Sequence, residues 1–279
     1  MSESPDFPFE FERKFLVSSL PDGVAEHGAP QVIIQAYVFA EAGYAIRVRL
    51  SFRGATIKGA AATPTREPAR PEVMDSREPT SMAPNALEVN SADANSPDAN
   101  SADANSADAN APEPTPPAAK MPVFDPAVDE LGAYERRLLA QLLKDNPGLA
   151  VATVAVKSPS INGERYEMET ELDPDVAVQI IQRSGRIVAK TRHSLWVGED
   201  GWEFDVFAGQ NAGLIVAEIE RLTPVVDLEI PEFCVTEVTA DPRFTNDSLS
   251  KTPWQHWDGL YMAELAQRGP FFLNLGENS

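Results

Sequence analysis

Residues 9–17 read FEFERKFLV, and charged and apolar side chains alternate along them. Because successive side chains of a β-strand point to opposite faces of a sheet, residues two positions apart share a face. Glu10, Glu12 and Lys14 therefore share one face, and the three phenylalanines lie on the other. The stretch predicts a strand with one charged face and one apolar face.

The same alternation recurs in five further segments. Their charged positions are Arg47 and Arg49; Arg165, Glu167 and Glu169; Lys190 and Arg192; Glu203 and Asp205; and Glu218 and Glu220. For any single strand, the alternative interpretation is an ordinary antiparallel sheet with one solvated face. Across six strands this alternative weakens, because like charges at positions i and i+2 repel each other on an open face. The pattern favours a charged surface that is turned inward.

An inward-facing charged surface predicts a barrel rather than an open sheet. A barrel of about eight strands has an interior just wide enough for side chains or one small ligand. An empty interior with unpaired charges would be prohibitively costly. A bound polyanion with divalent cations offsets that cost, because Arg and Lys take phosphate oxygens and carboxylates hold Mg²⁺ or Mn²⁺. We therefore expect an α+β fold: a closed eight-stranded antiparallel β-barrel, or tunnel, with helices packed outside.

Strand patterns account for most of the chain outside its middle. The eight expected strands are Phe9–Val17, Gln31–Phe39, Tyr44–Phe52, Ala150–Lys157, Arg165–Leu172, Ile187–Leu195, Gly201–Phe207 and Ile215–Leu222. A helix is expected after Asp173-Pro174, where an N-cap residue precedes proline, and it ends at Ser184-Gly185. A further helix is expected near Gly259–Arg268.

An insertion at 53–148 interrupts what is otherwise one domain spanning 1–279. Its residues 60–123 are poor in large apolar groups and repeat a short Asn-Ser-Ala-Asp-Ala unit, so we expect them to be disordered. A helix is expected over 125–145, because Asp125-Pro126 resembles a helix start and Asn146-Pro147-Gly148 a helix end.

The overall composition excludes several classes of protein. The formal net charge of −20 argues against nucleic-acid binding, because proteins that bind nucleic acid usually carry a basic patch. A single cysteine, Cys234, excludes an intramolecular disulfide and a cysteine-based zinc cluster. No signal peptide and no run of 18 apolar residues is evident, so we expect a cytoplasmic protein with no membrane partner. The oligomeric state is left open.

The segment at 9–17 resembles the ExExK signature of the CYTH family, also called triphosphate tunnel metalloenzymes. The order of the other motifs strengthens the resemblance, which extends over nearly the whole chain except about 53–148. The matching segments are Gln35-Ala36-Tyr37, Arg47-Val48-Arg49, Lys157, Arg165-Tyr166-Glu167-Met168-Glu169, Lys190-Thr191-Arg192, Asp205-Val206-Phe207, Ala217-Glu218-Ile219-Glu220, Glu237-Val238-Thr239 and Asn246.

The resemblance implies an eight-stranded tunnel that binds a triphosphate with Mg²⁺ or Mn²⁺. It implies that Glu10, Glu12, Glu218 and Glu220 are metal ligands and, with Lys14, the catalytic residues. Glu167, Glu169 and Asp205 match further acidic positions, at which a metal-binding role is less certain. The phosphate-binding residues that it implies are Lys14, Arg47, Arg49, Lys157, Arg165, Lys190 and Arg192.

The insertion creates one ambiguity in this assignment. It separates Arg49 from Lys157, and Thr56-Ile57-Lys58 locally resembles the same Thr-x-Lys strand of the family. We prefer Lys157 over Lys58, because the Arg-x-Glu-x-Glu element follows Lys157 across Asn162-Gly163, a hairpin turn signal.

The function that the resemblance favours is metal-dependent hydrolysis of the terminal phosphate of inorganic triphosphate or short-chain polyphosphate. Water would attack the terminal phosphorus in line, while cations stabilise the charge on the transferring and leaving oxygens. Two alternatives stay open: an adenylate cyclase or organic (thiamine or nucleoside) triphosphatase on the same barrel, and a non-catalytic polyphosphate-binding module. The inorganic substrate is preferred because no motif in the sequence indicates a nucleoside or thiamine pocket.

Overall fold

A computed structural model describes residues 9–24, 28–57, 130–159, 164–223 and 225–274. The chain divides into two compact units, one of Met1–Pro68 with Lys120–Ser279 and the other of Ala69–Ala119. The second unit lies wholly outside the described residues, as does the expected disorder of 60–123. The account below concerns the first unit.

The first unit is built on a nine-stranded antiparallel sheet with the order β5-β4-β3-β2-β6-β7-β8-β1-β9. All eight expected strands are present within a few residues of their predicted ends. The bounds are β1 Phe9–Val17, β2 Gln31–Glu41, β3 Tyr44–Arg53, β4 Ala150–Lys157, β5 Glu164–Leu172, β6 Ile187–Val197, β7 Asp200–Phe207, β8 Ile215–Arg221 and β9 Cys234–Glu237.

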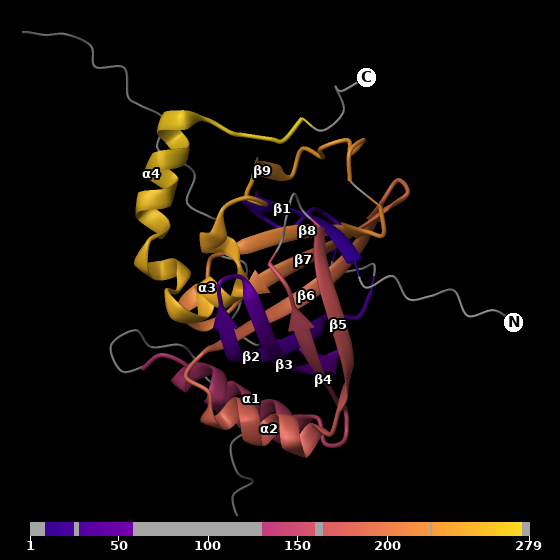
Figure 1. Cartoon of the computed structure of the whole chain (residues 1–279), viewed down its shortest axis with the longest axis vertical. Coiled ribbons are helices and arrows are strands. Elements are labelled where there is room, and N and C mark those ends of the chain that lie inside the picture. The colour runs from indigo at the N-terminus through magenta and orange to yellow at the C-terminus, as the bar shows by residue number, and fades with distance from the viewer. Residues whose placement is uncertain (1–8, 25–27, 58–129, 160–163, 224, 275–279) are drawn as a thin grey trace, which may run out of the picture. The chain divides into compact units, whose positions relative to one another are not determined.

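The prediction of a closed barrel of eight strands is not fully correct, because β1 pairs with three different strands. One edge of β1 pairs with β8. Its other pairings are with β5 over the three pairs from Phe9↔Tyr166 to Phe11↔Glu164, and with β9 from Phe15 to Val17. Because β9 pairs with the C-terminal residues of β1, β5 pairs only with the N-terminal residues of β1. The sheet therefore curves until β5 meets β1 (Figure 1), but it has nine strands and lacks the full seam of an eight-stranded barrel.

Among the described residues four α-helices accompany the sheet: α1 Ala133–Asp145, α2 Pro174–Arg183, α3 Asn246–Lys251 and α4 Asp258–Arg268. The predicted start of α2 is confirmed, since the Asp173 carboxylate accepts hydrogen bonds from the backbone N–H groups of Asp175 and Val176. The expected helix near Gly259–Arg268 is confirmed as α4.

The predicted start of α1 is wrong. The helix begins at Ala133 rather than near residue 125, because Gly132 has a φ of 79°, a left-handed conformation that an α-helix cannot contain. Asp125 and Pro126 lie outside the described residues.

The apolar faces of the strands pack against helices and form the core. Helices α1 and α2 lie below the sheet in Figure 1. Leu138 of α1 and Ile181 of α2 join Val48 and Leu50 of β3 in one buried cluster. A second cluster surrounds Phe15, and a third involves α3 and α4. These clusters leave the opposite, charged faces of the strands to line the interior.

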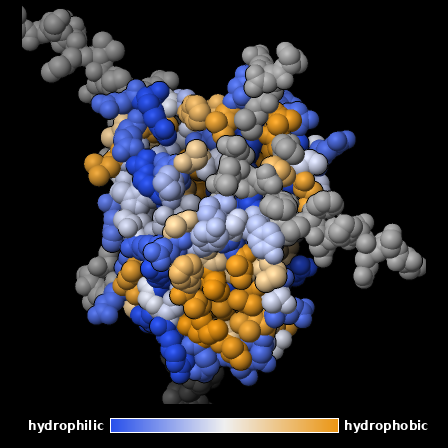
Figure 2. All heavy atoms as spheres, in the orientation of Figure 1, coloured by the Kyte–Doolittle hydropathy of each residue, from blue (hydrophilic) through white to orange (hydrophobic). Residues whose placement is uncertain are grey.

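Part of the outer face of the strands carries an exposed apolar surface, which none of the described helices covers. Cross-strand neighbours Phe39, Ile46, Val156 and Met168 form a row over β2 to β5, and all four side chains are exposed. Figure 2 shows apolar side chains gathered on the face where β3 and β4 lie. No helix in the described part of the chain has the length and apolar character needed to cross a membrane.

Candidate active site

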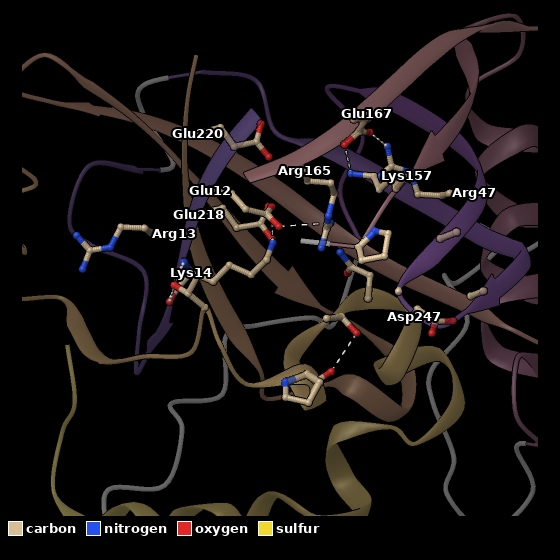
Figure 3. Close-up of a pocket in the computed structure, with 18 of the residues that line it drawn as sticks. Glu12, Arg13, Lys14, Arg47, Lys157, Arg165, Glu167, Glu218, Glu220 and Asp247 are labelled. Atoms are coloured by element: carbon tan, nitrogen blue, oxygen red, sulfur yellow. Dashed lines mark hydrogen bonds and ion pairs between the residues drawn. The ribbon is translucent and has the colours of Figure 1, made fainter. Parts of the chain in front are cut away.

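The charged faces of the strands surround a cavity of about 1140 Å³ (Figure 3). Nearly all the predicted site residues line it: Glu12, Lys14, Arg47, Arg49, Lys157, Arg165, Glu167, Glu169, Lys190, Arg192, Glu218 and Glu220. The two exceptions differ in kind. Asp205 is fully buried beneath the lining, and the side chain of Glu10 lies outside the described residues.

Strand register explains why these residues meet. Lys14 lies opposite Glu218 and Glu12 lies opposite Glu220 in the pairing of β1 with β8. Directly opposed residues of an antiparallel pair place their side chains on the same face, a few ångströms apart. Charged residues that alternate along each strand therefore meet charged residues of the neighbouring strand, as Lys14 meets Glu218.

Lys14 holds two carboxylates together at one side of the cavity. Its Nζ atom donates to Glu12 Oε2 at 2.9 Å and to Glu218 Oε1 at 2.6 Å. Burial pushes the pKa of Lys14 down, but the two carboxylates outweigh it and raise the pKa above its ordinary value. Burial likewise acts to raise the pKa of Glu218, but Lys14, Lys190 and Arg192 hold it well below the usual range. Lys14 and Glu218 are therefore both charged at neutral pH.

The buried carboxylate of Asp205 binds the two cations of β6, Lys190 and Arg192. Its carboxylate accepts from Arg192 Nε at 2.7 Å and Nη2 at 2.8 Å, and it also contacts the Lys190 ammonium. Arg192 Nη2 reaches on to Glu218 Oε2 at 2.9 Å. Burial lowers the pKa of Lys190 to about 8 although Asp205 opposes this change, so the ammonium remains protonated at neutral pH.

A second group of charges comes from β3, β4 and β5. Arg47 Nη2 donates to Glu167 Oε1 at 3.0 Å and to Glu169 Oε2 at 2.7 Å, and Lys157 also contacts Glu167. Lys157 therefore lies within this charged group. The competing candidate, Lys58, falls outside the described residues, and the two residues before it are not part of a strand.

Three guanidinium groups in the cavity each have a buried N–H donor without a hydrogen-bond partner among the described residues. The Nε atoms of Arg47, Arg49 and Arg165 are buried and have no hydrogen-bond partner among the described residues. A buried donor that is left unsatisfied costs about 1–3 kcal/mol, and more when it belongs to a charged group. These donors therefore indicate an anionic ligand with several oxygen atoms.

The acidic residues fit a hard divalent cation in chemical type. Glu12 and Glu220 face each other across β1 and β8, and like charges in that position repel unless a cation lies between them. Burial, with a contribution from Glu218, raises the pKa of Glu220. The carboxylates of Glu12 and Glu218 point toward Lys14. Among the described residues no three potential ligands are close enough together to bind a metal ion. The metal-ligand assignment therefore stays a prediction.

The structure also places residues at the site to which the sequence assigned no role. Tyr37 of β2 and Asp247 of α3 line the cavity. Arg13, between Glu12 and Lys14, points away from it (Figure 3) and pairs with Glu237 of β9 at 3.0 and 2.7 Å. Strand alternation gives the outward direction of Arg13. Its partner depends on the pairing of β9 with β1, which no local pattern indicates.

One sequence relative shows the family to which the chain belongs. No family model matches the chain. An inorganic triphosphatase of Acetivibrio thermocellus is 32% identical over 106 residues, which span 37% of this chain and 68% of that protein. Among solved structures, an inorganic triphosphatase aligns at 18% identity with a TM-score of 0.39, covering 86% of this chain and 93% of the other. A protein of Pyrococcus horikoshii aligns at 13% identity with a TM-score of 0.33, covering 77% and 79%. On the strength of the sequence relative, the chain belongs to the CYTH family, the triphosphate tunnel metalloenzymes.

Proposed function

We propose that the protein hydrolyses the terminal phosphate of inorganic triphosphate or short-chain polyphosphate within the cavity. The observation that carries this proposal is the set of buried Nε donors on Arg47, Arg49 and Arg165, which a phosphate chain would satisfy. The relative from Acetivibrio thermocellus, an inorganic triphosphatase, supports the same substrate class. In this proposal the curved sheet, joined where β5 meets β1, surrounds the substrate as a tunnel.

The cations of the cavity would hold the phosphate chain. They are Lys14, Arg47, Arg49, Lys157, Arg165, Lys190 and Arg192, which come from five of the nine strands. Guanidinium groups bind phosphate oxygens through two parallel hydrogen bonds, and ammonium groups act as point charges. Because these cations approach from several directions, they would fix the terminal phosphorus for in-line attack by water and stabilise the charge that develops on its oxygens.

The carboxylates would hold Mg²⁺ or Mn²⁺ beside the phosphates. Glu12, Glu218 and Glu220 offer the oxygen ligands that these hard cations prefer, and Glu10 is the fourth predicted ligand. When bound, such a cation supplies Lewis-acid polarisation of the phosphate oxygens. Glu167 and Glu169 are engaged with Arg47, and Asp205 with Arg192, so we propose that these three position the cations.

A phosphate-release screen tests the proposal. Purified protein is incubated with tripolyphosphate, ATP, thiamine triphosphate or longer polyphosphate, each with Mg²⁺ and with Mn²⁺. The expected result is that tripolyphosphate is hydrolysed fastest. Preferred hydrolysis of an organic triphosphate, or formation of cyclic AMP from ATP, would assign the protein to a different activity of the family. Tight binding of tripolyphosphate without any phosphate release would identify a binding module instead.

A further inference from the structure

The row of apolar side chains on the outer face of β2 to β5 belongs to a larger exposed patch (Figure 2). Directly opposed residues of an antiparallel pair lie on the same face of a sheet, so the row is continuous across four strands. Together with two neighbours it forms the outer patch: Val38, Phe39, Ile46, Val156, Tyr166 and Met168. Each of these residues is 36% to 58% exposed.

A β-bulge in β2 turns Phe39 toward the outer patch. The register of β2 against β3 shifts between Tyr37 and Phe39, which leaves Val38 as an extra residue in the strand. Without the bulge, Phe39 would share the cavity-facing side of Tyr37, because residues two positions apart lie on one face. With it, Phe39 lies opposite Ile46 on the outer face. Bulges commonly re-aim a side chain in this way, and this one enlarges an exposed apolar surface.

The outward positions of β3, β4 and β5 carry no charged side chain where these strands pair. They are Ile46, Val48, Leu50 and Phe52 of β3, Ala150, Ala152, Val154 and Val156 of β4, and Met168, Thr170 and Leu172 of β5. Apolar residues are expected around Leu50, which is buried against α1 and α2. The outer patch continues the same composition beyond these helices, although 24% of the residues in the chain are charged. An exposed face of this kind indicates a contact surface.

The size of the outer patch suits one half of a protein interface. The exposed fractions of its six side chains correspond to an area on the order of 500 Å². The largest apolar patch on a typical monomer covers about 300–600 Å² and is often functional. A stable interface buries about 800 Å² on each partner and has an apolar centre with a polar rim. The outer patch is therefore large enough to supply the apolar centre of such an interface.

Charge favours a second copy of the chain as the partner. With a formal net charge of −20, two copies repel each other wherever acidic groups meet. Exposed charges are screened beyond about 8–10 Å, so the groups near the contact decide the repulsion, and the outer patch contains none. A basic partner would be attracted to the acidic surface elsewhere and not to this face. Two sheets can also stack face to face about 10 Å apart, with interdigitating side chains.

We propose that two copies of the chain form a dimer in which their outer patches pack face to face about a twofold axis. In such an interface the same residues make the contact on both sides. The cavity is lined from the opposite face of these strands, so the interface lies outside it. The proposal therefore does not depend on the identity of the substrate.

Analytical ultracentrifugation of the full-length protein tests the proposal. We expect the wild type to sediment with twice the mass of the chain at micromolar concentration. Phe39→Lys and Met168→Lys, at the two ends of the row, should each sediment as monomers with an unchanged circular dichroism spectrum, because the dimer would bury unpaired ammonium groups. The matched control is Leu260→Lys on α4, whose residue is 70% exposed outside the outer patch, and it should remain a dimer.

The salt dependence of the dimer separates an apolar contact from one made by ion pairs. Raising NaCl from about 0.1 to 1 M shortens the Debye length from about 10 to 3 Å and screens the repulsion between two acidic copies. We therefore expect the dissociation constant of the dimer to fall. Dissociation at high salt would overturn the proposal, as would a dimer that persists in both Phe39→Lys and Met168→Lys. A monomeric wild type would also overturn it and would assign the patch to a different partner.

Discussion

At the scale of single residues, Glu218 connects cations that come from two different strands of the site. One carboxylate oxygen accepts from Lys14 at 2.6 Å and the other accepts from Arg192 at 2.9 Å. It therefore joins the cation of β1 to the cations of β6. Cations on both sides hold the pKa of Glu218 well below its usual range, so this candidate metal ligand is ionised at neutral pH.

Replacing Glu218 with Gln removes this charge and keeps its shape. We expect phosphate release from tripolyphosphate to fall by about a hundredfold or more, as when one electrostatic group of an active site is lost. The variant should retain the wild-type circular dichroism spectrum. The matched control is Glu171→Gln, because Glu171 is exposed on β5 and does not line the cavity. Similar activity in the two variants would refute the role of Glu218.

Arg13 shows a different use of charge, because its guanidinium stabilises the fold through Glu237 and not through the charged groups of the cavity. Its guanidinium pairs with Glu237 and also donates to the carbonyl oxygen of Leu273 at 3.0 Å, and Glu237 accepts from the backbone of Leu273 at 2.7 Å. This network fastens the segment after α4 to β1 and β9.

The variant Arg13→Met leaves Glu237 buried without its cation. We expect it to lower the free energy of unfolding by about 3–5 kcal/mol, measured by urea denaturation. The double variant Arg13→Met with Glu237→Leu should recover part of this loss, because no isolated charge then remains. A loss below about 1 kcal/mol in the single variant, as for an exposed ion pair, would show that the pair is not buried in solution.

At the scale of elements, the strands were predictable because each carries its own signal. Alternation at a period of two marked six of the eight expected strands and the inward direction of most site residues, including Arg47 and Glu218. The partners of these residues were not predictable, because they depend on register between segments far apart in the chain. Asp205 illustrates this limit: its inward direction follows from β7 alone, whereas its burial beneath Lys190 and Arg192 requires the pairing of β7 with β6.

The two corrected elements also depended on information outside their own segments. The start of α1 is determined by the left-handed conformation of Gly132, which a helical pattern in the following residues does not reveal. The ninth strand, β9, is only four residues long and is defined by its pairing with β1. That pairing also limits the contact between β5 and β1, so the closure of the sheet could not be deduced from strand patterns alone.

Helix α2 offers a test of an element that the sequence predicted well. The Asp173 carboxylate accepts hydrogen bonds from two backbone N–H groups of its first turn, at 2.9 and 3.1 Å. We expect Asp173→Ala to lower the free energy of unfolding by about 1 kcal/mol, as for other lost N-caps, with activity unchanged. Asp175→Ala, in the same turn, should have a smaller effect. Equal losses in urea denaturation would argue against the cap.

At the scale of the whole molecule, the cavity is assembled from residues on both sides of the insertion. Its described lining comes from residues 11–49 and 157–273. We therefore propose that the chain works as one domain in which the inserted segment is a tether without a catalytic role. Deleting residues 62–120 should leave kcat and KM for tripolyphosphate within about twofold of the wild type, because binding and turnover depend on groups in the cavity. A loss of activity in a deletion variant that still unfolds cooperatively would assign the insertion a role.

The central claim is that this cavity hydrolyses a phosphate chain with the help of a divalent cation. The most direct measurement is steady-state phosphate release from tripolyphosphate by the full-length protein, with Mg²⁺ or Mn²⁺, with excess EDTA, and after the metal is restored. We predict steady release with at least one of the metals, loss of release with EDTA, and recovery when the metal returns. Release that continues unchanged in EDTA would contradict the role of the carboxylates, and no release with either metal would contradict the proposed activity.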